Sequence, residues 1–322
     1  MNKINFKKNL NKSYQKVQKS ISNPIVVHLS KEKYLSTSLY HPRCINFTYF
    51  IRQEADVLMS HGVADKNYLS MKDVDGRMIN KFEHIFVPGP WLKRKLLTQD
   101  GVKLTPEQIH VVGWPRLDVL LAQRNLYLET PKEAGKKINV LWAPTHDYRK
   151  RGEENESTST YPKFAEYTDG MSNKYNYTVA LHPRNRKSKE ATENPLAEAD
   201  FVISDFGTMV YEAWALGIPV IFPRWILKDR VIKYVKGSAE AYIFENNIGL
   251  HADSIDEVHR FISEGKPVGS DVKEFMQDYL PSENLGQSGK LISEKLASIK
   301  VKHSKIKVVN FYLKLIKSKL GM

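Results

Sequence analysis

Short apolar runs alternate with longer segments of helical periodicity along most of the chain. The runs are rich in β-branched residues, and we expect strands at Pro24–Leu29, Val57–Ser60, His84–Val87, His110–Val112, Asn139–Ala143, Tyr177–Leu181, Phe201–Ser204 and Pro219–Phe222. Runs that are apolar throughout are typical of parallel strands covered on both faces. Helical patterns lie between many of them, as at Pro90–Thr98 and Met209–Leu216. This alternation predicts a parallel α/β architecture.

The polar segment 121–138 separates two such α/β blocks. The chain has 322 residues, more than a single core usually holds, so two domains are expected. We predict an N-terminal domain over 23–130 and a second domain over 131–299, flanked by basic amphipathic segments at 1–22 and 300–322. The charged stretch 147–160 has no periodicity and is expected to be a disordered loop.

The excess of positive charge is confined to the two ends of the chain. Lysine and arginine number 49 against 36 acidic residues, which gives a formal charge of +13. Residues 1–20 hold six lysines and no acid, and residues 300–322 hold seven lysines and no acid, so 21–299 is neutral. A nucleic-acid-binding protein usually presents a basic groove across its fold, and the neutral body argues against that function.

The basic ends carry amphipathic patterns. In the tail, apolar residues recur at helical spacing: Val309, Tyr312, Leu313, Ile316 and Leu320. A weaker stripe near the N-terminus consists of Leu10, Tyr14, Val17 and Ile21. Such a pattern is typical of a helix lying on an anionic membrane surface. The alternative is that each helix packs on its own domain and its lysines are only solvated.

The location of the protein follows from three absences in the sequence. No apolar run reaches the roughly 20 residues that cross a bilayer, the N-terminus has no signal-peptide core, and Cys44 is the single cysteine. A reducing compartment is the simplest interpretation. We therefore expect a cytoplasmic protein, attached peripherally to the inner face of the cell membrane.

Ligands of open α/β sheets bind beyond the carboxyl ends of the strands. The residues delivered there by the predicted strands are His61 and Gly62, Arg116, Thr145 and His146, His182 and Arg184, and Asp205, Gly207 and Thr208. Histidines follow three of these strands. Any one of them could be a hydrogen-bonded structural group, and their convergence favours a site.

The turn "SDFGTMVYEA" has the chemistry of a phosphate site. Gly207 has no Cβ, so the backbone can approach a ligand closely, and Thr208 begins a helix whose N–H groups and dipole favour an anion. Glu212 lies one turn on and shares a helix face with Thr208, where a carboxylate can accept hydrogen bonds from a ribose. In the alternative interpretation Thr208 is only an N-cap and Glu212 only a first-turn acid.

Several common site motifs are missing from the sequence. There is no P-loop, GxGxxG, HExxH, GxSxG or cysteine-based zinc motif, which argues against an ordinary NTPase and a standard dinucleotide enzyme. No cofactor is implied. A divalent metal is possible, but the sequence has no dedicated metal site; Asp205 could bind a metal, although orienting the turn is its simpler role.

Six segments in order, "SHGVADKNY", "HIFVPGPWLKRKLL", "VVGWPRLDVL", "VLWAPTHDY", "VALHPR" and "ADFVISDFGTMVYEAWALGIPVIF", resemble the CDP-glycerol glycerophosphotransferase family. The resemblance spans about residues 55–225. It implies a GT-B fold, in which two Rossmann-like domains flank a cleft, and a peripheral membrane enzyme that builds teichoic-acid-like or capsular polyol-phosphate polymers.

The resemblance also implies roles for individual residues. His61 falls where the family carries its candidate catalytic base, and His182 falls where a histidine meets the donor diphosphate. Thr208 matches a hydroxyl position near the phosphates, and Glu212 matches a position suited to the ribose. Where the family often has two hydroxyl residues, this chain has Gly207 and Thr208. The donor could therefore be CDP-glycerol, CDP-ribitol or another activated polyol or sugar.

We hypothesise that an acceptor hydroxyl attacks the β-phosphorus of a CDP-linked polyol and that CMP leaves. His61 would take the proton, while His182, Arg184 and the helix start would offset the diphosphate charge. Thr145 and Glu212 would hold the donor. His146, Arg116 and Gly62 would face the cleft with less defined roles, as would Asp205 and Gly207 in the turn. The acceptor would be a glycan or a lipid-linked molecule.

Other functions stay open at this point. A nucleotide-sugar glycosyltransferase or an epimerase-like enzyme would share the fold, and a sugar transferase would release a nucleoside diphosphate instead of CMP. A non-catalytic membrane-bound scaffold for capsule assembly would show no turnover. A nucleic-acid binder would show salt-sensitive binding to any duplex.

Overall fold

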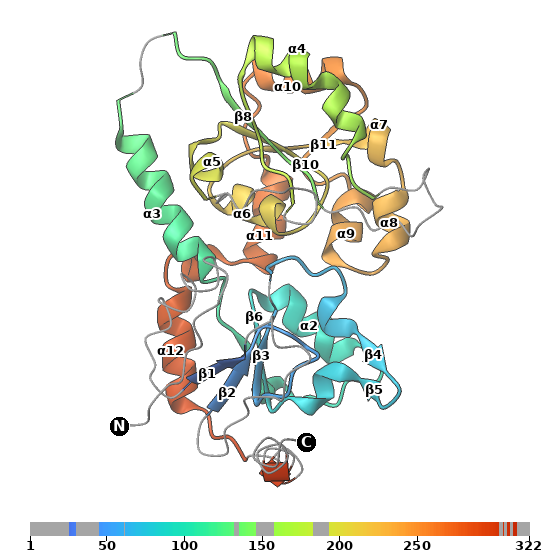
Figure 1. Ribbon diagram of the computed structural model, residues 1–322, viewed down its shortest axis with the longest axis vertical. Coiled ribbons are helices and arrows are strands. Elements are labelled where there is room, and N and C mark those ends of the chain that lie inside the picture. The colour runs from blue at the N-terminus through green and yellow to red at the C-terminus, as the bar shows by residue number, and fades with distance from the viewer. Residues whose placement is uncertain are drawn as a thin grey trace. The chain divides into compact units, whose positions relative to one another are not determined.

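A computed structural model describes residues 26–29, 45–60, 62–131, 135–145, 158–182, 193–302, 305, 308–309 and 312–313. These residues divide into two compact units (Figure 1). The first unit takes the described residues up to Ser60, then Tyr68–Asp118 and the residues from Glu283 onward. The second unit consists of Gly62–Asn67 and Val119–Ser282. The chain therefore passes between the units several times.

The first unit is built on a parallel sheet of five described strands. In sheet order they are β1 (Val26–Leu29), β2 (Ile45–Thr48), β3 (Val57–Met59), β6 (His84–Val87) and β7 (Ile109–Val111). The order in the sheet follows the order in the chain without a reversal. Helix α2 (Pro90–Thr98) connects β6 to β7, and a small hairpin is formed by β4 (Lys72–Asp73) and β5 (Gly76–Arg77). Phe47 of β2 and Phe86 of β6 are almost fully buried in the core of the first unit, with their ring centroids 6.0 Å apart.

The segment "GWPRLD" anchors a C-terminal helix to the first unit. Gly113 has a φ of +73°, and a Cβ there would lie 2.3 Å from Oγ of Ser288, so only glycine fits. The carboxylate of Asp118 accepts the N–H groups of Ser288 (3.1 Å) and Gly289 (2.7 Å) at the start of α12 (Ser288–Ser298). Burial raises the pKa of Asp118, and these hydrogen bonds oppose that rise. In this unit the motif residues are used for packing and capping.

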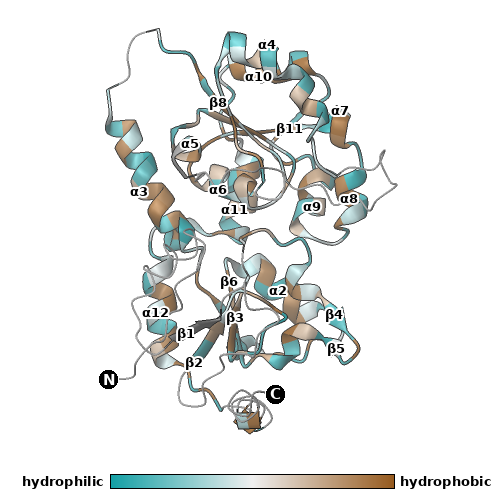
Figure 2. Cartoon of the chain, in the orientation of Figure 1, coloured by the Kyte–Doolittle hydropathy of each residue, from teal (hydrophilic) through white to brown (hydrophobic). Residues whose placement is uncertain are grey.

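The second unit also has a parallel sheet of five described strands, with a different strand order. The sheet runs β9 (Asn176–Val179), β8 (Asn139–Ala143), β10 (Phe201–Ser204), β11 (Val220–Pro223) and β12 (Leu250–Ala252). Every residue of β8, β10 and β11 is buried, as expected for parallel strands covered on both faces. Figure 2 shows these strands as apolar segments between amphipathic helices.

Helices cover both faces of the second sheet (Figure 1). They are α4 (Thr168–Lys174), α5 (Glu193–Glu198), α6 (Thr208–Ala215), α7 (Arg224–Leu227), α8 (Arg230–Tyr234), α9 (Ala239–Glu245), α10 (Ile255–Ser263) and α11 (Ser270–Tyr279). One apolar cluster joins Trp142 to Phe164 and to Phe261 of α10. Elsewhere in the unit, helix α6 packs against α11. The rings of Tyr211 on α6 and Tyr279 on α11 are stacked, with their centroids 4.4 Å apart.

The strands and the α/β class predicted from the sequence are confirmed, with shifts of one or two residues at several ends. Strands β2, β4, β5 and β12 were not predicted. Polar residues interrupt the apolar run in β2 (INFT) and β12 (LHA), and β4 and β5 have two residues each. Helix α3 (Arg116–Glu129) covers 121–129, where the sequence indicated only a polar boundary. The predicted division also differs, since α12 lies with the first unit and Gly62–Asn67 with the second.

The two basic ends are only partly described. The N-terminal stripe from Leu10 to Ile21 lies outside the described residues. In the tail, Val309, Tyr312 and Leu313 are helical and about half exposed. Within the described part of the chain, none of the helices has the length and apolar character to cross a membrane.

Candidate functional site

The strand order of the second sheet reverses between β8 and β10. Strand β9 follows β8 in the chain and pairs on one side of it, while β10 pairs in parallel on the other side. Connections that leave β8 and β10 in opposite directions open a crevice beyond their carboxyl ends, which is where open α/β sheets bind ligands. Thr145 follows β8 at this edge, and Asp205 through Thr208 follow β10.

Asp205 ties the two strand ends together. It is completely buried, and its Oδ2 accepts the N–H of Thr145 (2.8 Å) and the hydroxyl of Ser159 (3.0 Å). Burial raises the pKa of Asp205 to about 6, and hydrogen bonds from Thr160, Thr145 and Ser159 oppose that rise. The predicted role of orienting the turn is the one these contacts support.

The end of the polar stretch 147–160 is part of this core, contrary to the predicted disordered loop. Thr158, Ser159 and Thr160 are buried. The hydroxyl of Ser159 also donates to the carbonyl of Thr145 (2.9 Å), and Thr160 accepts the indole N–H of Trp142 (3.1 Å). Because Thr158, Ser159 and Thr160 are all polar, their burial through hydroxyl hydrogen bonds left no hydrophobic signal in the sequence. Residues 146–157 lie outside the described part of the chain.

The turn after β10 has the predicted geometry. Helix α6 begins at Thr208, and Gly207 is its N-cap with a φ of +111° and no side-chain cap. Glu212 stands one turn further on and is outside the first turn. The alternative interpretation, Thr208 as an N-cap and Glu212 as a first-turn acid, is therefore wrong. Because the N-cap is a glycine, its side chain cannot accept a hydrogen bond from the leading N–H groups of α6, and such N–H groups suit an anion.

Residues Gly62–Asn67, which follow β3 of the first unit, lie on this edge of the second unit. A Cβ on Gly62 would stand 2.6 Å from Oγ1 of Thr208, so a larger residue would have to displace the threonine. The carbonyl of Val63 accepts the hydroxyl of Tyr279 (2.7 Å). The glycine after the first predicted histidine thus packs against the start of α6.

A buried carboxylate holds the segment in place. Glu240 accepts the N–H of Asp65 (2.9 Å), the N–H of Lys66 (2.8 Å) and the hydroxyl of Tyr211 (2.7 Å). In return, Oδ2 of Asp65 accepts the N–H of Ala239 (3.0 Å) at the start of α9. With these contacts the segment is fixed by backbone hydrogen bonds at both of its central residues, so its side chains have defined directions.

Lys66 brings an ammonium group to the strand ends. Its Nζ donates to Oγ1 of Thr145 (3.2 Å), lies 4.7 Å from the ring centroid of Phe206, and would stand 2.8 Å from a Cβ on Gly207. Burial lowers the pKa of Lys66 to about 8, although Glu240 and Asp205 both favour its charged form. Gly207 is therefore required twice, for its positive φ and for the approach of this lysine.

The structure thus places Gly62, Thr145, Asp205, Gly207 and Thr208 close together and adds Lys66. The sequence analysis missed Lys66 together with the residues that position it, chiefly Asp65 and Glu240. A lysine five residues after a predicted strand-end histidine is a weak signal by itself. Its partner Glu240 lies 174 residues away in the chain, so the pairing has no local pattern.

Other predicted residues are not tested by this geometry. His182 is half-buried beyond the end of β9, Glu212 is fully buried on α6, and Arg116 begins α3 in the first unit. His61, His146 and Arg184 lie outside the described residues. Their roles stay predictions. Among the residues that the structure describes, no group of three or more histidine, cysteine or acidic side chains could hold a metal ion.

Two parallel α/β units, the second with a glycine-capped helix start where its strand order reverses, define a fold of the GT-B type. Solved structures of the wall teichoic acid polymerase TagF have this fold. One matches all of this chain and 90% of its own with a TM-score of 0.55 and 14% identity, and another matches 75% of this chain and 67% of its own with a TM-score of 0.52 and 15% identity. UDP-GlcNAc 2-epimerase from Neisseria meningitidis matches 85% of this chain and 76% of its own at a TM-score of 0.47 and 16% identity.

The likeness to TagF confirms the GT-B-like fold predicted from the sequence. At this level of identity the likeness concerns the fold alone. No protein-family model and no curated protein sequence matches the chain.

Proposed function

We propose that the protein transfers a phosphopolyol group from a CDP-linked donor to a hydroxyl acceptor, in the synthesis of a teichoic-acid-like or capsular polymer. The observation that carries this proposal is the contact between Lys66, Thr145 and Gly207 at the start of α6. TagF, whose fold the chain shares, has been studied in crystals soaked with CDP-glycerol. The resemblance in sequence motifs points to the same donor class.

The donor diphosphate would lie between the ammonium of Lys66 and the start of α6. A glycine with positive φ leaves backbone N–H groups open to phosphate oxygens, and the partial positive charge of the helix start adds to the attraction. Lys66 is held in a partly buried place, where a charge interaction is stronger than in water. Thr145 would then contact both the lysine and a phosphate oxygen.

In the proposed reaction an acceptor oxygen attacks the β-phosphorus as the bond from that phosphorus to the bridging oxygen breaks. CMP leaves with the bridging oxygen, and the acceptor proton passes to His61. His61 is covalently next to Gly62, the residue that packs against Thr208. Lys66 would stabilise the charge that develops on the leaving CMP, and His182 and Arg184 would contact the same diphosphate.

The membrane partner is proposed on a separate observation. The tail from residue 300 carries seven lysines and no acid, and its described apolar side chains at Val309, Tyr312 and Leu313 are about half exposed. Such a segment would hold the enzyme at an anionic inner leaflet, where a lipid-linked acceptor would be found. Sedimentation with anionic vesicles, compared with neutral vesicles, tests this attachment.

The experiment that tests the transfer is measurement of nucleotide release. Purified protein is incubated with CDP-glycerol, CDP-ribitol or UDP-sugars and an oligosaccharide or lipid-linked acceptor, beside the variants His61→Ala and Lys66→Met. The control variant is Lys273→Met, which removes an exposed lysine of α11. We expect CMP from a CDP-polyol, its loss in both site variants, and no change in the control.

Three other results would contradict the proposal. UDP release would instead indicate a nucleotide-sugar glycosyltransferase, which the same phosphate site would suit. Release that survives Lys66→Met would remove the lysine from the site. Absence of turnover with every donor, in a protein that stays folded, would favour a non-catalytic scaffold.

A further inference from the structure

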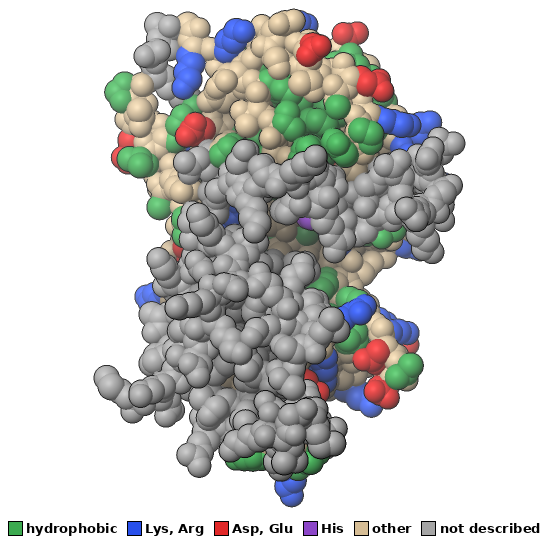
Figure 3. Space-filling view, viewed as in Figure 1, with side chains coloured by type: hydrophobic (Ala, Val, Ile, Leu, Met, Phe, Trp, Pro, Cys, Tyr) green, Lys and Arg blue, Asp and Glu red, His purple; other side chains and the backbone are tan. Residues whose placement is uncertain are grey.

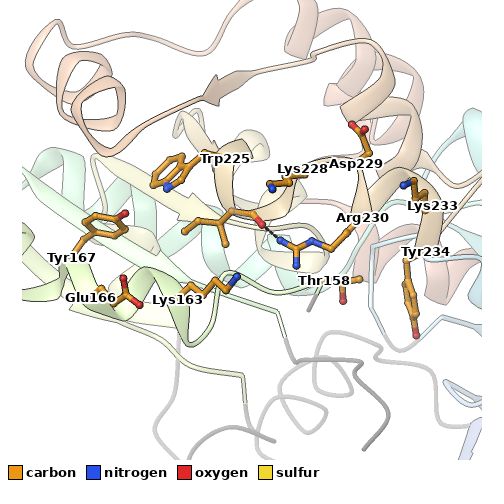
Figure 4. A pocket seen from close by; sticks show the side chains of 11 residues that line it. Thr158, Lys163, Glu166, Tyr167, Trp225, Lys228, Asp229, Arg230, Lys233 and Tyr234 are labelled. Atoms are coloured by element: carbon orange, nitrogen blue, oxygen red, sulfur yellow. Dashed lines mark hydrogen bonds between the residues drawn. The ribbon is translucent and has the colours of Figure 1, made fainter. Parts of the chain in front are cut away.

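A second pocket opens in the second unit beside the switch point, and the proposed reaction does not use it (Figure 4). Its volume is about 790 Å³, within the range of roughly 300–1,000 Å³ that small-molecule sites occupy. One wall comes from Thr158 and the helical segment after it, and the other from α7 and α8, which follow β11. Thr158 directly precedes Ser159, which binds Asp205, so the pocket adjoins the site at the same sheet edge.

The lining is basic. Lys163, Lys228, Arg230 and Lys233 line the pocket against two acids, Glu166 and Asp229, an excess of two positive charges. Figure 4 shows Lys163 on one side and the other three on the opposite side. The guanidinium of Arg230 donates to the carbonyls of Ile226 and Leu227, so it is already engaged by the backbone.

The side chains of Lys163, Lys228 and Lys233 contribute no ion pair to the described part of the structure. They are exposed at the pocket rim, and none forms a salt bridge with any residue that the structure describes. Lys228 also has a φ of +49°, a conformation that costs energy for a residue with a Cβ and that recurs at binding sites. A glycine would relieve that cost, so a lysine at this turn indicates a use for its charge.

The other end of the pocket is aromatic. The rings of Trp225 and Tyr167 meet at 6.0 Å and 73°, and both line the cavity. Figure 3 shows apolar side chains gathered on the visible face of the second unit, with basic ones at the margin. Separate cations beside an apolar wall suit a ligand with several phosphate groups joined by carbon-bearing units.

We propose that this pocket binds the phosphate-bearing acceptor chain, with its phosphodiester groups on Lys163, Lys228 and Lys233 and a carbon-bearing unit against Trp225. The inference rests on the proposed function for the identity of the chain as an acceptor. It goes beyond that function in giving the acceptor a subsite separate from the donor diphosphate. The nucleobase of the donor is the competing occupant.

The test is a comparison of two affinities in one variant. Isothermal titration measures binding of CMP and of a synthetic glycerol-phosphate trimer to the full-length protein and to the double variant Lys228→Gln/Lys233→Gln. The matched control, Lys236→Gln/Lys273→Gln, removes two exposed lysines of the same unit outside the pocket. Melting temperatures of all three proteins establish that they are folded.

We expect the trimer to bind about tenfold more weakly to the pocket variant, as the loss of two partly exposed ion pairs would produce. CMP affinity and the control should not change. An unchanged trimer affinity, or wild-type protein that binds no trimer, would overturn the proposal. A parallel loss of CMP affinity would assign the pocket to the nucleobase instead.

Turnover separates this proposal from the proposed function. If wild-type protein transfers the phosphopolyol to a short uncharged acceptor and releases CMP, while the pocket variant binds the trimer normally, the function stands and the acceptor subsite is wrong. If no donor turns over but the trimer binds through the lysines, the reaction is wrong and the pocket still binds a phosphate-bearing chain.

Discussion

The two units are built alike, with five described parallel strands each, yet their strand orders differ. In the first sheet the order follows the chain, whereas in the second it reverses between β8 and β10. A reversal sends the two connections to opposite faces of the sheet, and sheets of this kind bind ligands beside that point. Chain topology, rather than the presence of a parallel sheet, therefore distinguishes the unit that carries the candidate site.

The two units also use the glycine after a strand differently, Gly113 after β7 in the first unit and Gly207 after β10 in the second. Gly113 lets Asn284 and Ser288 come close, and the nearby Asp118 caps α12. Gly207 lets the ammonium of Lys66 come close instead. One glycine therefore serves packing and the other a site, although both follow a short apolar strand.

The substitution Lys66→Met is expected to have the largest effect on the second unit. It keeps the length of the side chain and removes its charge, so we expect kcat/KM for CMP release to fall by about 10²–10³, as for loss of one transition-state donor. The melting temperature should stay the same or rise, because the partly buried charge is gone. A large fall in melting temperature would mean that Lys66 serves the fold.

The next largest effect is expected for Gly207→Ala, set against Gly217→Ala. Both glycines have positive φ, but a Cβ meets Lys66 at position 207 and open space at position 217. Gly217→Ala should lose about 1 kcal/mol of stability from its positive φ. Gly207→Ala should lose about 1–3 kcal/mol, because its φ of 111° and ψ of −167° lie in a region that only glycine readily adopts. Activity per folded molecule should fall roughly 10–100-fold only at 207, since the lysine is displaced. Equal activities would show that the close approach has no function.

The pH dependence of donor affinity is a smaller effect with a defined sign. The pKa of Lys66 is lowered to about 8, so the free protein loses the ammonium as the pH rises through that value. The Kd for donor should be flat below pH 8 and rise by up to about tenfold per pH unit above it. Lys66→Arg keeps its charge throughout and should flatten the profile.

The pKa of Lys66 also affects stability. As the pH rises above 8, donor affinity should fall, whereas the contribution of Lys66 to the free energy of unfolding should rise. Between pH 8 and the ordinary lysine pKa of 10.5, the unfolded chain binds more protons at Lys66 than the folded chain does. Its contribution to the free energy of unfolding therefore rises with pH in that window. The difference between wild type and Lys66→Met in urea unfolding isolates this contribution.

The smallest effect belongs to the first unit. Asp118→Ala removes the acceptor for two N–H groups of α12 and should lower the free energy of unfolding by about 1 kcal/mol. Asp118→Asn, which keeps an acceptor oxygen, should recover part of this. Activity per folded molecule should change less than twofold. A large loss of activity would contradict the assignment of this motif to packing.

Much of the fold could be predicted from local pattern. Strands β8 and β10 were predicted with their observed ends, because apolar runs between turns are a local signal. The start of α6 at Thr208 and the glycine before it were likewise visible in "SDFGTMVYEA". The alternation of strands and helices was enough for the α/β class.

The part that could not be predicted depends on distant contacts. Lys66 reaches the site because Glu240, far along the chain, accepts its N–H. Ser159 is buried through hydroxyl hydrogen bonds between two other polar residues, Thr158 and Thr160. Neither periodicity nor propensity records such pairings, because both describe only neighbours in sequence.

The interleaving of the two units has a consequence for biosynthesis. The first unit includes the strands before Asp118 and also α12, so it cannot be completed until the ribosome has made everything between them. The second unit in turn needs Gly62–Asn67, which emerges before its own sheet exists. Neither unit is a continuous fragment of the chain, and a truncation before Glu283 removes the part of the first unit that contains α12.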